Sequence, residues 1–194
     1  MMKKLLPSQL LSLEEYDKSR EEIKSNLILH KKNRSIKIGE NVLLLFEDYE
    51  TIKYQVQEML RIEKIFKEKD IQEEIDAYEA LIPDGDNLKA TMLIMYADVN
   101  ERKVMLNRLS DLENNVWLSI DGSKRVFAIS DEDLERSRDE KTSAVHFLRF
   151  QLNDSEKNSF KNSLNIVFGI DHKEYNFQTI IDKTTIDSLS EDFD

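Results

Sequence analysis

The chain has 194 residues, of which 40% are hydrophobic and 35% are charged, a composition typical of a folded globule with a heavily charged surface. Its 28 Lys and Arg against 39 Asp and Glu leave a formal charge of -11, which repels phosphate backbones and anionic lipids, so we expect no nucleic acid and no membrane partner. The absence of cysteine excludes disulfides, thiolate zinc sites and cysteine-ligated iron–sulfur clusters within this chain.

The N-terminal segment is not typical of a secretory signal. Pro7, Ser8 and Gln9 interrupt the apolar stretch that follows Lys3 and Lys4. No later segment approaches the roughly 20 apolar residues that a membrane span requires. We therefore expect a cytoplasmic protein, which also agrees with the lack of cysteine.

The first half of the chain predicts three helices and three strands. Ser12 with Glu15 forms a capping-box pattern that begins a long helix ending near residue 32. A hairpin of strands 36–38 and 42–46 follows, and Asp48 is the expected N-cap of a second helix that ends near residue 67. The pattern then predicts a third helix over 70–81 and a strand over 88–96.

The second half predicts a helix over 99–112 and then the strongest hairpin signal in the chain. Asp121 and Gly122 separate strands 116–120 and 125–129, as in a tight two-residue turn. The remaining elements are a charged loop or short helix over 131–141, a long strand over 144–152, a helix over 154–163, a strand over 166–170 and a weak final helix. The acidic end, Glu191–Asp194, is expected to fray.

These elements indicate an α+β fold with a mainly antiparallel sheet covered by helices. The 4 Gly and 2 Pro do not gather into a linker. We therefore expect a single domain over residues 1–194.

The second helix carries acids that the helical pattern places among apolar residues. Glu58 lies with Gln55 in an apolar patch, and Glu63 falls inside the main apolar stripe. A carboxylate removed from water requires a partner. The candidate partners are cationic or titratable side chains on other elements with a buried face, namely Arg20, His30, His146 and Arg149.

Two interpretations of these polar residues remain open. In the first, Glu58, Gln55 and a histidine form a pocket for a metal ion or small polar ligand, with candidate binding residues Gln55, Glu58, His146, Arg149 and His30. In the second, the same side chains form an internal network that fixes helix packing. On the predicted strand, alternation places His146 on the core face and Arg149 on the opposite face.

Other possible sites are weaker. Asp131, Glu132, Asp133 and Glu135 could attract a cation, but acids at a helix start commonly complement the helix dipole. The sequence contains no glycine-rich phosphate loop, no zinc-protease motif and no nucleophile elbow. Catalysis through one of these motifs is therefore not expected.

Four motifs in order along the chain resemble a known bacterial family. They are LLFED (Leu44–Asp48), YQVQEMLRIE (Tyr54–Glu63), IPDGDNLKAT (Ile82–Thr91), and DEDLER (Asp131–Arg136) followed by KTSAVHFLRF (Lys141–Phe150). Together they resemble the family known as domain of unknown function 3501, and the resemblance covers nearly the whole chain.

The resemblance implies no established activity. Genes of this family are often found beside those of rubrerythrin-like di-iron proteins and iron–sulfur oxidoreductase subunits, which implies a role in redox or peroxide metabolism. Two hypotheses follow: an accessory or interaction protein whose partners are rubrerythrin-like or iron–sulfur proteins, or a small enzyme or binding protein that uses the Glu, Gln and His pocket.

Overall fold

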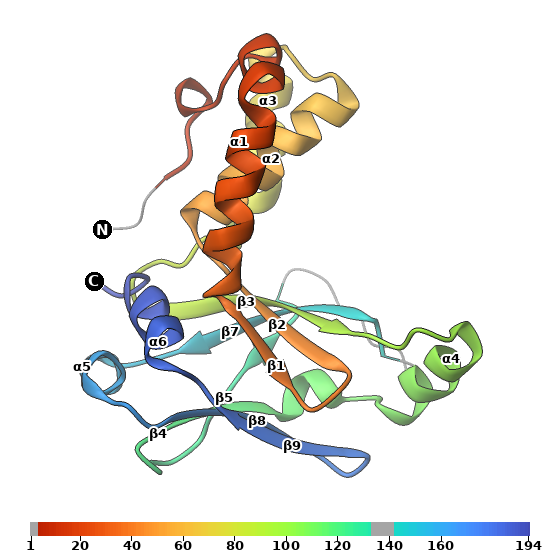
Figure 1. Cartoon of the computed structure of the whole chain (residues 1–194), viewed down its shortest axis with the longest axis vertical. Helices are drawn as coiled ribbons and strands as arrows, with labels where there is room; N and C mark the ends of the chain where they lie inside the picture. Colours follow the sequence, from red (N-terminus) through yellow and green to blue (C-terminus); the bar gives the residue numbers. More distant parts are fainter. Residues whose placement is uncertain (1–3, 133–141) are drawn as a thin grey trace.

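The computed structural model describes residues 4–132 and 142–194, and the helices that come first in the chain form an arm. Helix α1 (Leu13–Lys32) begins at Ser12, whose hydroxyl accepts a hydrogen bond from the main-chain N of Glu15. Helix α2 (Tyr49–Glu63), helix α3 (Glu68–Glu79) and the short 3-10 helix η1 (Pro7–Gln9) complete the arm. Figure 1 shows this arm projecting from a body made of strands and shorter helices.

Two antiparallel sheets form the body. The first has the order β1-β2-β3-β7-β6, with β1 Ser35–Ile38, β2 Val42–Glu47, β3 Asn87–Ile94, β7 Val145–Gln151 and β6 Ile129–Ser130. The second has the order β5-β4-β8-β9, with β5 Val126–Phe127, β4 Val116–Ile120, β8 Ile166–His172 and β9 Tyr175–Ile180. The α+β class and the antiparallel pairing are thus confirmed, with the strands divided between two sheets.

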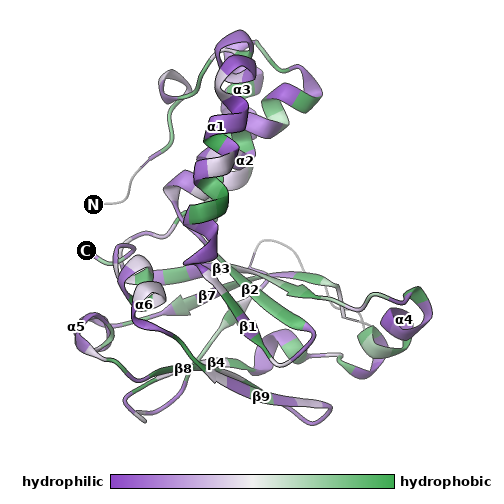
Figure 2. Cartoon of the chain, viewed as in Figure 1, coloured by the Kyte–Doolittle hydropathy of each residue, from purple (hydrophilic) through white to green (hydrophobic). Residues whose placement is uncertain are grey.

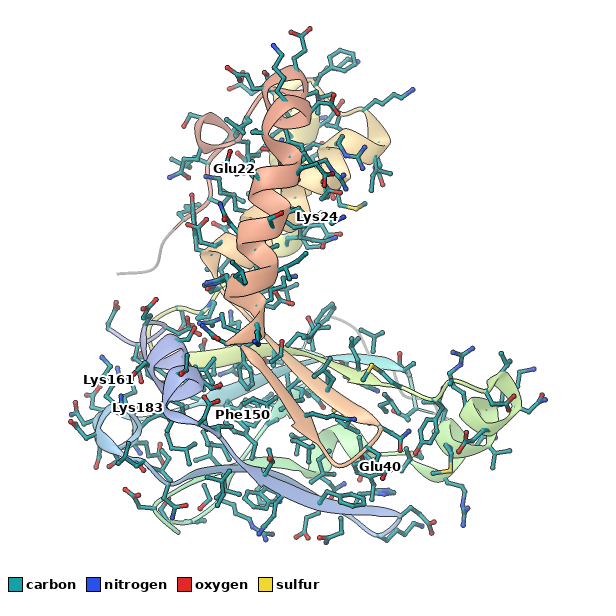
Figure 3. All side chains as sticks on the ribbon, in the orientation of Figure 1. Glu22, Lys24, Glu40, Phe150, Lys161 and Lys183 are labelled. Atoms are coloured by element: carbon teal, nitrogen blue, oxygen red, sulfur yellow. The ribbon has the colours of Figure 1, made fainter. Side chains whose placement is uncertain are left out.

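The main core lies between the two sheets. Phe46 and Phe150 of the first sheet pack against Phe168 of the second, with ring centroids 5.3 and 5.5 Å away. Figure 3 shows Phe150 in this interior position. The body also contains α4 (Val99–Arg108), the 3-10 helix η2 (Leu112–Asn115), α5 (Asp154–Asn162) and α6 (Lys183–Ser190). Figure 1 shows α4 at one end of the body and α5 and α6 at the other.

The arm has a separate, smaller core. It consists of the buried side chains Leu5, Ile52, Val56, Leu60, Ile75 and Ile82, with half-buried residues such as Leu13 and Tyr78 around them. Charged side chains such as Glu22 and Lys24 surround α1 (Figure 3), and Figure 2 shows hydrophilic and hydrophobic positions alternating along the arm. None of the described helices is long and apolar enough to cross a membrane.

Buried Arg34 joins the arm to the body just after α1. Only 1% of its side chain is exposed, and its guanidinium donates to the main-chain oxygens of Phe46 (3.2 Å), Glu47 (3.1 Å) and Ser188 (2.8 Å). It also forms an ion pair with Asp192 at 2.5 Å. This one side chain therefore ties α1, β2 and the end of α6 together.

The C-terminal residues are held in place, so the expected fraying of Glu191–Asp194 is wrong. Phe193 is buried and forms a parallel bridge with Gly85, and Asp192 pairs with Arg34. Lys161 donates to the main-chain oxygen of Phe193 at 3.1 Å. Acidic composition predicted fraying, but an apolar anchor and two cations outweigh it.

Most predicted elements are confirmed with shifted ends. The predicted strand over 125–129 is wrong as a single element, because it is divided into β5, which pairs with β4 in the second sheet, and β6, which pairs with β7 in the first. Helix α2 ends at Glu63 because Lys64 adopts a left-handed conformation, with φ 56°. Strand β9 was not predicted. Of the predicted loop or helix over 131–141, residues 133–141 lie outside the described part of the chain.

Candidate functional site

A buried polar cluster lies at one end of the first sheet. We call it the His146 cluster; it consists of Glu113, Asp131, Thr142 and His146. His146 projects from β7 on the face that also carries Leu148 and Phe150, and its side chain is 0% exposed. The predicted core-facing position of His146 is therefore confirmed, and strand alternation explains it.

Short contacts surround both ring nitrogens of His146. Nδ1 lies 2.6 Å from Oδ2 of Asp131, while Nε2 lies 2.8 Å from the hydroxyl of Thr142 and 3.0 Å from the main-chain oxygen of Ser143. The Thr142 hydroxyl donates to Oε2 of Glu113 at 3.0 Å, and this oxygen is 3.8 Å from Nε2. Nε2 is thus surrounded by oxygen atoms of three residues.

The groups around Nε2 are mainly acceptors. The Ser143 carbonyl and the Glu113 carboxylate can only accept hydrogen bonds, and the Thr142 hydroxyl, which has a single hydrogen, contacts both Oε2 of Glu113 and Nε2. A cation at Nε2 would therefore meet oxygen atoms of three residues. Asp131 on Nδ1 fixes the ring orientation, as second-shell carboxylates do for histidine ligands of metals.

The backbone at Asp131 explains how its carboxylate reaches His146. Asp131 follows β6 and adopts a left-handed conformation, with φ 48°, which aspartate tolerates better than most residues. Its main-chain N donates to the oxygen of Phe147, and its Oδ1 accepts from the main-chain N of Phe147 at 3.0 Å. The carboxylate therefore continues the β6–β7 ladder and projects its second oxygen to the imidazole.

Glu58 lies elsewhere, in the arm between α1 and α2. Its carboxylate accepts from Arg20 at 2.7 and 2.9 Å and from the hydroxyl of Tyr16 at 2.6 Å. The hydrogen bonds from Arg20, opposed by burial, lower the pKa of Glu58 from 4.5 to about 2. Burial and the hydrogen bond to Glu58 raise the pKa of Tyr16. Of the partners considered for Glu58, Arg20 is the one the structure provides.

His30, Gln55 and Glu63 do not join Glu58 in one pocket. His30 Nε2 lies 2.6 Å from Oδ2 of Asp48 at the start of α2, and Gln55 is half-buried. Glu63 is exposed, which corrects the prediction that it lies inside the apolar stripe, because α2 ends there.

Gln57 of α2 is buried. Its amide bonds both the main-chain N and O of Leu11, at 2.9 and 3.1 Å. The segment before α1 covers this face of α2, and helical periodicity within α2 cannot reveal such a contact.

His30 also lines a groove between α1 and α2. The groove has a volume of about 410 Å³, and its lining includes Tyr16, Tyr54 and Gln57. Glu58 and Gln55 are not among its lining residues. This groove is therefore distinct from the pocket expected from the sequence.

Arg149 projects from the opposite face of β7 to His146. Its guanidinium forms a two-point ion pair with Glu132, with both contacts at 2.7 Å. The sequence-based pocket of Gln55, Glu58, His30, His146 and Arg149 is thus distributed over three places.

Sequence reasoning missed Glu113 as a partner of His146. It considered Asp131 as part of an acidic run that could attract a cation or complement a helix dipole, and not as a partner of His146. Glu113 lies in the short 3-10 helix η2, and no periodic pattern marks it as buried. In the structure only 3% of the residue is exposed. The contact joins residues distant in sequence. The adjacent acids Asp131 and Glu132 were the one feature of the sequence that indicated the His146 cluster.

A protein-family model matches nearly the whole chain. The model of a family described as protein of unknown function (DUF3501) matches residues 4–193. The chain belongs to the DUF3501 family. The resemblance seen in the four motifs is thereby confirmed.

A solved structure is similar to this DUF3501 chain over its full length. It is the crystal structure of a novel protein of unknown function from Burkholderia pseudomallei at 1.90 Å resolution, with 48% sequence identity and a TM-score of 0.93. The match covers 99% of this chain and 100% of that chain. No curated protein matches the DUF3501 chain significantly. Neither description names an activity, so the function must be inferred from geometry.

Proposed function

We propose that the chain binds a divalent metal ion at the His146 cluster, with Nε2 of His146 and Oε2 of Glu113 as ligand atoms. The arrangement around Nε2 supports this assignment, because two potential ligand atoms lie 3.8 Å apart there. Ligand atoms about 2.1 Å from a shared ion lie roughly 3 to 4 Å from one another. The hydroxyl of Thr142 and the carbonyl of Ser143 can complete the coordination.

The ligand types limit the choice of metal. One imidazole with carboxylate, hydroxyl and carbonyl oxygens suits Zn²⁺, Mn²⁺ or Fe²⁺ better than a soft ion such as Cu⁺. Asp131 contributes by holding Nδ1 of His146, which keeps the imidazole in position. Compared with the pocket expected from the sequence, the proposed site has Glu113 in place of Glu58 and keeps His146.

Metal analysis of the purified chain tests this proposal. After dialysis against Zn²⁺, Mn²⁺ or anaerobic Fe²⁺, elemental analysis should find one equivalent of one of these ions in the wild type and a large loss in His146→Gln. The control is His172→Gln, because His172 is also buried but bonds to the main-chain oxygen of Ser110 at 3.1 Å. A wild-type chain that retains none of the three metals would show that the cluster is a purely structural network.

A second candidate function is a cytoplasmic accessory protein in a redox- or peroxide-linked system, with a rubrerythrin-like or iron–sulfur protein as its partner. The family resemblance motivates the choice of partner. The exposed apolar side chains of the arm, Ile28 and Leu29 on α1, Ile62 on α2 and Phe66 after it, offer contact surface.

Co-purification from the native host under gentle conditions tests the accessory role. The expected result is recovery of a redox protein with the wild-type chain and its loss with Leu29→Glu or Phe66→Glu. Leu164→Glu serves as the control, because Leu164 is equally exposed but lies after α5 in the body. Recovery of the chain without any redox protein would contradict this candidate.

A further inference from the structure

A cavity of about 780 Å³ lies where α3 meets the outer face of the first sheet, on the side of β7 away from the His146 cluster. We call it the outer pocket. Its lining combines apolar side chains with charges of both signs: Tyr78, Leu81, Lys89, Glu132, Phe147 and Arg149, with Glu74 and Asp84 among the others. This volume is within the range of roughly 300 to 1,000 Å³ that is usual for small-molecule sites.

Two cations lie side by side in this pocket. Lys89 of β3 and Arg149 of β7 are directly opposite each other in the antiparallel register, and alternation places both on the outer face. Like charges directly opposite on a sheet destabilise the pair unless an anion lies between or beside them. The sheet therefore presents a position where a carboxylate is favoured.

The protein's own Glu132 currently occupies that position. Its two carboxylate oxygens accept from Nε and Nη2 of Arg149, both at 2.7 Å, which is the fork geometry by which arginine recognises carboxylates. The hydrogen bond from Arg149 lowers the pKa of Glu132, so Glu132 is an anion at neutral pH. The Glu132 side chain is 50% exposed, and an ion pair this exposed contributes little stability.

The remaining charges of the pocket have other roles. Asp84 accepts hydrogen bonds from Asn87 and from the main-chain N of Asp86 within its own turn, at 2.7 and 3.1 Å. Burial and the nearby Glu63 raise the pKa of Glu74. Lys89 donates to the main-chain oxygen of Ala80 at 2.7 Å, and burial lowers its pKa, so a further anion would stabilise its charged form.

We propose that the outer pocket binds a small organic carboxylate, whose carboxylate replaces the Glu132 side chain on Arg149 and whose apolar part lies against Tyr78, Leu81 and Phe147. Glu132 then acts as an internal competitor that returns to solvent when the ligand binds. The half-buried aromatic and aliphatic side chains beside Arg149 favour a ligand with a flat, apolar body over a simple inorganic anion.

The competitor role of Glu132 gives the proposal a distinctive signature. Glu132→Gln removes the competing charge and leaves Arg149 in place, so it should tighten binding of a carboxylate ligand. Arg149→Gln removes the recognition fork and should weaken binding. A pocket in which Arg149 and Glu132 serve only as a surface ion pair predicts neither change.

The test is an NMR titration of isotope-labelled protein with benzoate, and with benzamide as its uncharged isostere, following the Arg149 side-chain N–H and the amides of β7. Benzoate is expected to bind about tenfold more tightly than benzamide, about three- to tenfold more tightly to Glu132→Gln than to the wild type, and at least about tenfold more weakly to Arg149→Gln.

Arg125→Gln is the matched control for these titrations. Arg125 also forms a surface ion pair with a carboxylate, Asp171, at 2.6 Å, but it lies beside the second sheet. Its variant should bind benzoate as the wild type does. The proposal is overturned if Glu132→Gln does not tighten benzoate binding, if Arg149→Gln leaves it unchanged, or if neither the wild type nor Glu132→Gln shows shifts at Arg149.

Discussion

Asp131 and Glu132 are neighbours in the chain, yet their carboxylates pair with opposite faces of β7. Asp131 bonds His146 on the buried face at 2.6 Å, and Glu132 bonds Arg149 on the outer face at 2.7 Å. Both contacts depend on the left-handed backbone at Asp131. The proposed metal site and the outer pocket therefore share one short segment of chain. A substitution of Asp131 can be tested by metal binding, and a substitution of Glu132 by carboxylate binding.

Replacing Asp131 tests the positioning of His146. Asp131→Asn removes the charged acceptor of Nδ1 while keeping a residue that tolerates the left-handed conformation. We expect metal affinity to fall roughly 10- to 100-fold, the usual cost of losing a second-shell carboxylate. Competition with a chromophoric chelator measures the affinity.

The control for Asp131→Asn is Asp121→Asn. Asp121 is also left-handed, with φ 50°, and its carboxylate accepts a hydrogen bond from Ser163 at 2.7 Å, away from the cluster. Its variant should keep wild-type metal affinity. Equal affinities in the wild type and in Asp131→Asn would show that Asp131 does not orient a metal ligand.

Glu58 is predicted to contribute to stability and not to a binding pocket. Because the pKa of Glu58 falls from 4.5 to about 2 on folding, its ionised form favours the folded state by about 3 kcal/mol at neutral pH. A lowered pKa makes this contribution complete above about pH 5 and removes it as the pH falls through 4.5 toward 2.

Urea unfolding of Glu58→Gln checks the prediction. The variant should be about 2 to 3 kcal/mol less stable than the wild type at pH 7, and the difference should shrink toward zero near pH 2. Glu63→Gln, on the same helix but exposed, should change stability by less than about 0.5 kcal/mol. A difference for Glu58→Gln that does not vary with pH would contradict the assignment of the shift to the Arg20 pair.

Much of the fold was predictable because its signals are local. The Ser12 and Glu15 capping box begins α1, and Asp48 caps α2, as expected from the sequence. Alternating burial in β2 and β7 matches the alternation of their side chains. Strand β9 was missed although Tyr175 and Phe177 alternate with the polar Asn176 and Gln178. Tyr175 is the one buried residue of this edge strand, so its short alternation reflects little burial.

The site was only partly predictable because its contacts join distant segments. Strand alternation alone placed His146 in the core, but the partners Glu113 and Asp131 lie on other elements whose positions depend on sheet order. Periodicity indicated that Glu58 needs a partner but could not choose Arg20 over a histidine. The side chain that a buried charge will meet is set by tertiary packing.

The junction between arm and body should depend on Arg34. Arg34→Met keeps an unbranched side chain but leaves Asp192 and three main-chain oxygens without their donor. Breaking a buried ion pair from one side costs roughly 3 to 5 kcal/mol. Thermal unfolding should show this loss, whereas exposed Lys37→Met on β1 should remain close to the wild type. A stable Arg34→Met variant would mean that these acceptors find water in its place.

Gly169 of β8 is predicted to be required for the packing of Trp117 on the outer face of the second sheet. The two residues are opposite each other in the β4–β8 register, and a Cβ at Gly169 would lie 2.2 Å from Cζ2 of Trp117. Gly169→Ala must therefore displace the buried indole and with it the guanidinium of Arg125, which stacks 4.1 Å from the ring centroid. Overpacking of this kind costs about 1 to 3 kcal/mol. Trp fluorescence measures the displacement of the indole, and urea unfolding measures the loss of stability.

Gly122→Ala is the contrasting variant, because a Cβ at Gly122 would meet nothing within 4 Å and the cost of the substitution arises from φ 73° alone. If Gly169→Ala unfolds as the wild type does, with unchanged fluorescence, the indole must have an alternative position at no cost in free energy.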